Sequence, residues 1–200
     1  MSKKNQCTTC NPLSWSEILK LIDDLKQNEN YRFAVLVGLG AYAGLRISDV
    51  LKLRWKEILN AEVLILQEKK TEKTRRIYLN QNLQKLISCA YKQMKLKNPD
   101  TVVPENYVFL NRFKVKPISI QYVDRMLPVF LLQSRIKCSN SGTGTHILRK
   151  SFAKRVYDNG GCSEASLILL SEMFNHSTIK ITRKYIGLVE KEFQSAYMNL

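Results

Sequence analysis

Residues 30–45, NYRFAVLVGLGAYAGL, are apolar on nearly every side. A helix on the surface of a globular protein carries a polar face, whereas a helix that is hydrophobic all round is buried. The stretch therefore predicts a helix in the centre of the core. Its longest apolar run, about twelve residues, is too short to cross a bilayer.

The preceding segment, 11–26 (NPLSWSEILKLIDDLK), carries the start signals of another helix. Ser14 stands where an N-cap is expected, and Glu17 follows three residues later, which is the spacing of a capping box. Apolar residues then recur at helical spacing. We expect these two helices to form a central helical core.

Further helical patterns continue along the chain. Pro128 lies inside one of them and should kink or interrupt it, and Gly160 with Gly161 should end another. Residues 139–145, SNSGTGT, predict a flexible loop, and 108–113 a short strand or turn. Helical spacing is present over 46–58, 82–97, 118–136, 146–159, 163–174 and 177–187.

One segment has a different pattern. Two β-prone runs, VLILQ at 63–67 and RRIYL at 75–79, flank the polar stretch EKKTEKT. This arrangement predicts an antiparallel hairpin, although Asn-Gly or Asp-Gly is absent from its tip. The predicted fold class is mostly α with a small antiparallel β-sheet (α+β). We expect a polar leader over 1–11, one domain over 12–188 and a tail over 189–200.

Composition limits the partners that the chain can have. Its 200 residues suffice for one good core, and the formal net charge of +15 predicts a polyanionic partner. No secretion signal precedes the first helix, so we expect a cytoplasmic protein without a membrane partner. Cys7 and Cys10 form a CxxC, but no second pair at suitable spacing completes a zinc site, so we expect no metal.

Several polar pairs suggest that charged groups converge. Arg46 and Asp49 are three residues apart, so that the carboxylate could brace the guanidinium on one helix face. His146 and Arg149 have the same spacing at a helix start, after a glycine-containing loop. Each pair alone is typical of a solvated surface. Their recurrence in a basic, helical chain suggests a site that handles phosphate.

The closing stretch HSTIKITRKY places His176 nine residues before Tyr185. At 100° per residue these two side chains would lie on opposite faces of one continuous helix. They can converge only if the histidine precedes the helix, and Ser177 or Thr178 would then serve as its N-cap.

Four segments together resemble the catalytic domain of the tyrosine recombinases, the phage-integrase class of site-specific recombinases. They are AGLRISDVLKLRW (43–55), EKKTEKTRRIYL (68–79), THILRKSFA (145–153) and SEMFNHSTIKITRKYI (171–186). The resemblance implies this family's catalytic-domain fold and catalytic roles for Arg46, Lys70, His146, Arg149, His176 and the nucleophile Tyr185. Asp49 would support Arg46. Lys69 and Lys73 are alternatives for the catalytic lysine, and DNA contacts are expected from Lys69, Lys73, Arg75, Arg76 and Lys150.

The chemistry that this resemblance implies needs these residue types. Two arginines would neutralise the phosphodiester as charge builds in the transition state. Tyr185 would attack phosphorus to give a 3′-phosphotyrosyl link, with His146 taking up its proton and Lys70 protonating the leaving 5′-oxygen. The covalent bond would store the energy for religation, so that neither metal nor ATP nor another cofactor is expected.

The resemblance also leaves alternatives open. The family usually has Leu-Gly-His where this chain has Phe174-Asn175-His176, and asparagine tolerates the left-handed conformation that such a turn needs. We expect a short form similar to the fimbrial phase-variation recombinases, the alternative being a fragment. Type IB topoisomerase activity and a non-catalytic DNA-binding relative are the other functional hypotheses.

The implied partners are double-stranded DNA, accessory DNA-bending proteins and three further copies in a homotetramer on two DNA sites. The tail would serve that assembly through an apolar stripe of Val189, Phe193, Ala196 and Tyr197, or pack on its own domain.

Overall fold

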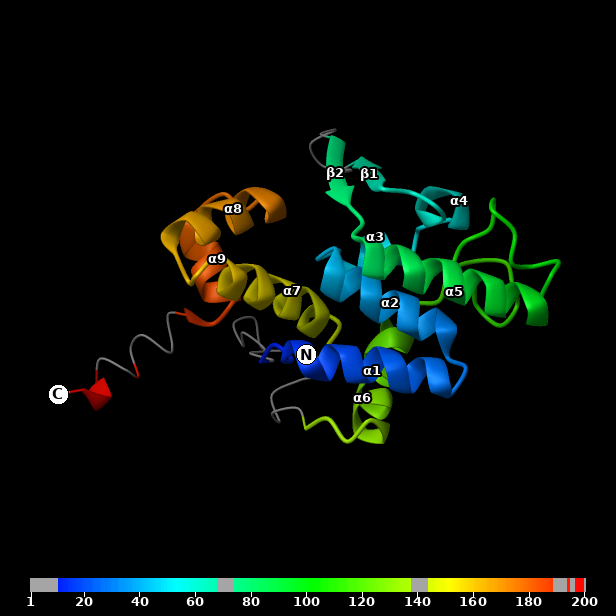
Figure 1. Cartoon of the computed structure of the whole chain (residues 1–200), viewed down its shortest axis with the longest axis horizontal. Coiled ribbons are helices and arrows are strands. Elements are labelled where there is room, and N and C mark those ends of the chain that lie inside the picture. The colour runs from blue at the N-terminus through cyan, green and yellow to red at the C-terminus, as the bar shows by residue number, and fades with distance from the viewer. Residues whose placement is uncertain (1–10, 68–73, 138–143, 189–193, 195–196, 200) are drawn as a thin grey trace, which may run out of the picture.

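The computed structural model describes residues 11–67, 74–137, 144–188, 194 and 197–199. Within these residues the chain is mostly helical, with a single two-stranded antiparallel sheet, as predicted (Figure 1). In chain order the elements are α1 (Trp15–Gln27), α2 (Tyr31–Tyr42), α3 (Ile47–Val50), α4 (Trp55–Ile58), β1 (Val63–Gln67), β2 (Thr74–Tyr78), α5 (Gln81–Lys97), α6 (Ile120–Gln133), α7 (His146–Asn159), α8 (Glu164–Phe174) and α9 (Ile179–Tyr185).

The central helix is α2, as predicted. It packs against α1, α5 and α7, and its side chains from Phe33 to Ala41 are buried. A Cβ at Gly40 would lie only 2.7 Å from the Leu148 Cβ, so this glycine lets α7 approach closely. The helix α1 begins with the predicted capping box, in which the Glu17 carboxylate accepts from the Ser14 backbone at 2.8 Å.

The prediction of one amphipathic helix over 46–58 is wrong. The segment forms two four-residue helices, α3 and α4, separated by a turn. The backbone between them finds its hydrogen bonds elsewhere: the Leu53 carbonyl accepts from Val108 N at 2.9 Å, and Trp55 N donates to the Asn106 carbonyl at 3.1 Å. These bonds to a distant segment replace the ones that a continuous helix would have made.

The predicted hairpin is confirmed. In it β1 pairs with β2 antiparallel, with Leu64 opposite Ile77 and both side chains buried. Ile65 and Tyr78 point to the other face and are exposed. The tip of the hairpin lies outside the described residues, and with it the candidates Lys69, Lys70 and Lys73.

The helix α6 continues through Pro128, so the predicted interruption does not occur. Apolar residues are buried on both sides of the proline, among them Leu127 and Leu131, and this burial holds the helix together. Gly160 caps α7 as predicted. The predicted strand or turn at 108–113 is a turn region with an isolated bridge between Leu110 and Pro117. Most of the predicted loop, residues 139–143, lies outside the described part of the chain.

The buried apolar residues fall into two clusters. The large cluster joins α1 to α6 with the first turn of α7. The small cluster consists of Phe152, Ala153, Leu167, Leu170, Phe174 and Ile186, from α7, α8 and the end of α9. Figure 1 shows α7, α8 and α9 grouped at one end of the molecule, with α7 leading back to α2. The helix α7 therefore connects the two clusters.

Little of the predicted tail can be described. Tyr197 is exposed, and the other members of the predicted apolar stripe, Val189, Phe193 and Ala196, lie outside the described residues. Among the helices that the structure describes, none has the length and apolar character to cross a membrane.

Candidate active site

Arg46 stands at the N-cap of α3, with extended backbone and an exposed side chain. Because it precedes the helix, it does not share a helix face with Asp49. In the described part of the chain no ion pair within 4.0 Å joins the two, and the Asp49 carboxylate accepts from Ser48 Oγ at 3.3 Å. The supporting role of Asp49 stays a prediction.

Arg149 is buried on α7, with 3% of its surface exposed. Its Nη1 donates to the carbonyl oxygen of Gly44, and its guanidinium carbon lies 3.7 Å from the centre of the Phe174 ring. The other terminal nitrogen, Nη2, is buried and has no hydrogen-bond partner among the described residues. Native structures rarely leave such a buried donor without a partner.

Gly44 is needed where it holds Arg149. Its φ is +60°, and a Cβ built there would lie 2.5 Å from the Phe152 ring. A side chain at this position would therefore meet both backbone strain and a steric clash. The glycine that ends the run after α2 places its carbonyl against the guanidinium.

Charges from several elements act on Arg149. Burial, and then the positive charge of Arg46, lower its pKa to about 9, and Arg75 acts in the same direction. The Tyr185 hydroxyl and the Asp49 carboxylate oppose this change. Side chains from α3, β2 and α9 therefore lie around one guanidinium, which still carries its charge at pH 7.

His146 is the first residue of α7, and it is exposed. Partial desolvation and the charges of Arg149, Lys150 and Arg46 lower its pKa, against the opposing charge of Asp124. The imidazole is consequently neutral at pH 7.

Asp124 of α6 caps the start of α7. Its Oδ1 accepts from the Thr145 backbone N–H at 2.9 Å, whereas the Thr145 side chain makes no capping bond of its own. A carboxylate beside the first turn also interacts favourably with the helix dipole. Asp124 thereby fixes the backbone immediately before His146.

The turn between α8 and α9 has the backbone that the sequence predicted. Asn175 is left-handed, with φ 53° and ψ 44°, and His176 N donates to the Ser171 carbonyl at 2.9 Å. This is a Schellman-type end of α8. Thr178 is the N-cap of α9, without a side-chain bond, so His176 does precede the helix.

His176 is held by a residue of the helix that follows it. Its Nδ1 lies 2.9 Å from the Oγ1 of Thr182, whose side chain is fully buried. Burial, and then the charges of Arg149 and Arg46, lower the pKa of His176. It too is neutral at pH 7, and its Nδ1 is engaged by Thr182.

Tyr185 ends α9, and its hydroxyl oxygen is buried. Its ring is 5.8 Å from the His176 ring and 5.7 Å from the Phe174 ring, nearly perpendicular to the latter. The ammonium of Lys150 is 5.6 Å from the centre of the Tyr185 ring.

The structure brings five sequence-predicted residues together: Arg46, His146, Arg149, His176 and Tyr185. Arg75 lies close enough to act on Arg149, while Arg76 is exposed on β2. The sequence reasoning missed four groups that hold these residues in place, namely the Gly44 carbonyl, Asp124, Phe174 and Thr182. For Phe174 a signal was present, because it departs from the leucine usual in the family.

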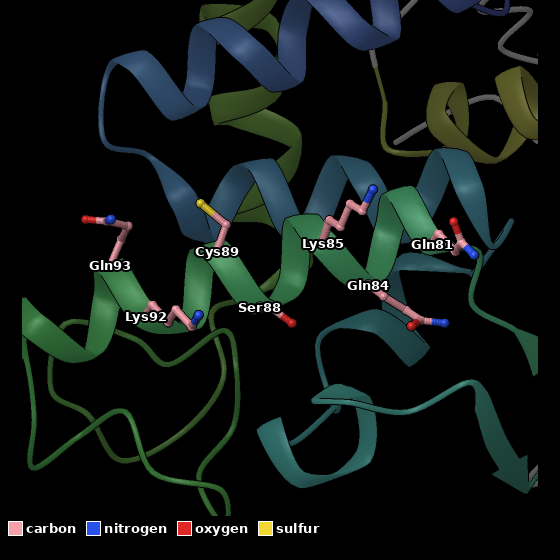
Figure 2. Close-up of a pocket in the computed structure, with 7 residues that line it drawn as sticks. All are labelled: Gln81, Gln84, Lys85, Ser88, Cys89, Lys92 and Gln93. Carbon is pink, nitrogen blue, oxygen red and sulfur yellow. The ribbon is translucent and has the colours of Figure 1, made fainter.

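A separate hollow lies on the outer face of α5, where Figure 2 shows its polar and basic side chains spread along the helix. It is lined by Gln81, Gln84, Lys85, Ser88, Cys89, Lys92 and Gln93. These residues include none of the predicted site residues. The catalytic candidates therefore lie outside this hollow.

Comparisons with known proteins identify the family of the chain. Residues 12–192 match the phage integrase family. A probable integrase/recombinase of Bacillus subtilis, YoeC, is 32% identical over 182 residues, which cover 90% of this chain and 92% of that protein. The tyrosine recombinase XerD of Staphylococcus epidermidis is 24% identical, over 92% of this chain and 60% of that protein.

Solved structures show the same fold. The XerA recombinase superposes with a TM-score of 0.70 at 21% identity, over 94% of this chain and 64% of that chain. The catalytic domain of bacteriophage HP1 integrase gives a TM-score of 0.59 at 19% identity, over 95% of both chains. The chain thus belongs to the phage integrase family, the tyrosine-type site-specific recombinases.

Proposed function

We propose that this protein cleaves and rejoins double-stranded DNA at defined sites through a 3′-phosphotyrosyl intermediate, without metal or ATP. The observation that carries the proposal is the buried guanidinium of Arg149, whose Nη2 has no protein partner in the described residues. Leaving such a donor unsatisfied is costly unless a ligand completes it. A phosphodiester oxygen has the charge and geometry to do so.

The two arginines would clamp the phosphate from different sides. Arg149 is rigid, because Gly44 and Phe174 hold it, whereas Arg46 is exposed and can adjust to the substrate. Positive charge that is preorganised in this way stabilises the pentacoordinate transition state more than the ground state.

The groups that can accept or donate protons also support attack by Tyr185. A phenol with pKa near 10 must lose its proton, and the neutral His146 can accept it. His176, with Nδ1 engaged by Thr182, can donate from Nε2 to a non-bridging oxygen.

The leaving 5′-oxygen needs a proton donor. Lys70 is the candidate, with Lys69 and Lys73 as alternatives, and all three lie at the hairpin tip outside the described residues. Arg75, on the adjoining strand, already lies within electrostatic reach of Arg149. A lysine at the end of this hairpin could therefore approach the same phosphate.

DNA as the partner is supported by the charge of +15 and by the relatives. XerH was solved bound to its difH substrate in a post-cleavage complex, and its fold covers 98% of this chain with a TM-score of 0.69 at 19% identity. Lambda integrase was solved as a dimer bound to a core site. We extend the proposal to DNA contacts by Arg75 and Arg76, to a homotetramer on two sites with accessory DNA-bending proteins, and to the cytoplasm.

The test uses nicked suicide DNA taken from the sequence that flanks the gene. We expect a covalent protein–DNA adduct on a denaturing gel, formed equally in EDTA and without ATP. Tyr185→Phe should bind the DNA and form no adduct, while the control Tyr78→Phe, at an exposed tyrosine on β2, should behave like wild type. A wild type that binds without forming an adduct, or an adduct with Tyr185→Phe, would refute the proposal.

The same preparation separates the remaining hypotheses. A type IB topoisomerase would relax any supercoiled plasmid, whereas a site-specific recombinase should require the defined site. A non-catalytic relative would bind DNA and form no adduct. In all cases binding should weaken steeply with added salt, because phosphate contacts release counterions.

A further inference from the structure

We propose that Phe174 is a positioning residue for strand cleavage, because one buried ring holds Arg149, His176 and Tyr185 in their relative places. This inference rests on the proposed function. It concerns a residue at which the chain differs from the leucine usual in its family.

The first contact is with the guanidinium of Arg149. The guanidinium carbon lies 3.7 Å from the ring centre, Phe174 is fully buried, and Arg149 is 3% exposed. A cation over an aromatic face is attracted by the ring quadrupole, and the attraction grows as water is excluded. Since only the Gly44 carbonyl is a described hydrogen-bond partner of this guanidinium, the ring face is the second support of the buried charge.

The second set of contacts is with the other two catalytic candidates. The His176 ring lies 5.4 Å from the Phe174 ring at 71°, and the Tyr185 ring lies 5.7 Å away at 88°. Perpendicular pairs at these distances are a favoured aromatic geometry. On its remaining side Phe174 packs on Phe152 at 6.0 Å, which ties the group to α7.

Leucine at position 174 could fill much of this volume but could not provide these interactions. An aliphatic side chain has no quadrupole to hold a guanidinium and sets no preferred angle for neighbouring rings. Because Phe174 ends α8 and is followed directly by the left-handed Asn175, its position is fixed by the backbone. The ring can therefore act as a reference point for residues from α7, the turn and α9.

The experiment measures single-turnover cleavage of nicked suicide DNA by Phe174→Leu. We expect the cleavage rate to fall about tenfold, with DNA affinity changed less than about twofold. The matched control is Phe109→Leu, at a phenylalanine that is equally buried but belongs to the large cluster. It should lose stability through the same change of side chain and cleave at the wild-type rate.

A graded series separates the ring's charge distribution from its bulk. Phenylalanine at 174 is replaced by its mono-, di-, tri- and pentafluoro analogues, which weaken the negative ring face stepwise at nearly constant size. We expect the logarithm of the cleavage rate to fall with each step. A series without slope, in a wild type that cleaves, overturns the role of Phe174 alone. A wild type that forms no adduct overturns the proposed function, and this inference with it.

Discussion

The two hydrophobic clusters differ in size and in the catalytic candidates that they support. The large cluster extends over α1 to α6, and of the catalytic candidates it carries Arg46 together with the start of α7. The small cluster has six buried apolar residues in the described chain, yet it supports His176 and Tyr185. Local stability follows the density of buried contacts. We therefore expect lower local stability in the part of the site that holds Tyr185, the proposed nucleophile.

Equal truncations in the two clusters test this difference directly, and they should have the largest effect on the free energy of unfolding. Leu36→Ala, in the large cluster, should lower the free energy of unfolding by about 2–5 kcal/mol and leave the cleavage rate of the folded protein unchanged. Leu170→Ala, in the small cluster, should cost about 2 kcal/mol and slow cleavage about tenfold or more. Both leucines are at most 1% exposed.

Urea denaturation and single-turnover cleavage measure this pair, and hydrogen exchange locates the change. Exchange should accelerate in α8 and α9 for Leu170→Ala and throughout the protein for Leu36→Ala. The distinction between the clusters would be wrong if both variants lost cleavage equally at matched stability.

Arg149 tests the junction between the clusters. Arg149→Lys keeps a positive charge but loses the planar fork, which contacts the Gly44 carbonyl and, in the proposed mechanism, a phosphate. We expect cleavage to fall about 10²–10³-fold while DNA binding changes little. Arg155→Lys is the matched control on the same helix, because Arg155 lies over the Trp15 ring and away from the site. If the two variants lost cleavage rate to a similar extent, Arg149 would have no special role in holding the phosphate.

A finer test concerns the small cluster alone. Thr182→Val keeps the shape of the buried side chain and removes the hydrogen bond to His176. Cleavage should slow about tenfold, because the imidazole loses its fixed orientation. Thr182→Ser, which restores the hydroxyl, should recover most of the rate in the same suicide-substrate assay. If Thr182→Ser cleaved as slowly as Thr182→Val, the packing of the Thr182 side chain, rather than its hydroxyl, would be what matters.

The smallest expected effect is that of a substitution at Asp124, which acts on the pKa of His146. Its charge opposes the lowering of the His146 pKa by desolvation, Arg149, Lys150 and Arg46. Asp124→Asn should therefore lower that pKa further, while its amide oxygen can still accept from the Thr145 N–H.

If neutral His146 accepts the tyrosine proton, the acid limb of the cleavage rate should move to lower pH in Asp124→Asn. The control is Asp100→Asn, at an exposed aspartate outside the site. Rates between pH 5 and 8 measure the shift, and an acid limb that moves upward would exclude this role. The lowered pKa values of His146 and His176 also predict that wild type loses stability as the pH falls below about 6.5, since protonation then favours the unfolded chain.

Much of the fold followed from local signals. The capping box at Ser14 and the all-round apolar pattern of α2 each depend on a few neighbouring residues, and both predictions are confirmed. The continuous helix over 46–58 failed because Leu53 and Trp55 bond to residues near 106–108. Pairing at that distance has no local signal. At Pro128 the local signal was present, but burial on both sides of the proline outweighed it.

The site divides in the same way. Helix geometry required His176 to precede α9 if it was to meet Tyr185, because nine residues of continuous helix would have put the two on opposite faces. The groups that hold the site were out of reach: Arg149 and Gly44 are 105 residues apart, and Asp124 and Thr145 are 21 apart. Thr182 is only six residues from His176, but nothing in its residue type predicts which side chain its hydroxyl contacts.

The left-handed backbone of Asn175 also bears on how related chains are found. The turn requires a residue that accepts φ near 53°, and both glycine and asparagine can supply this conformation. A search that demands glycine before the second histidine would pass over chains built like this one. A search defined by permitted backbone conformation would retain them and would group Phe-Asn-His with Leu-Gly-His as two solutions to one geometric demand.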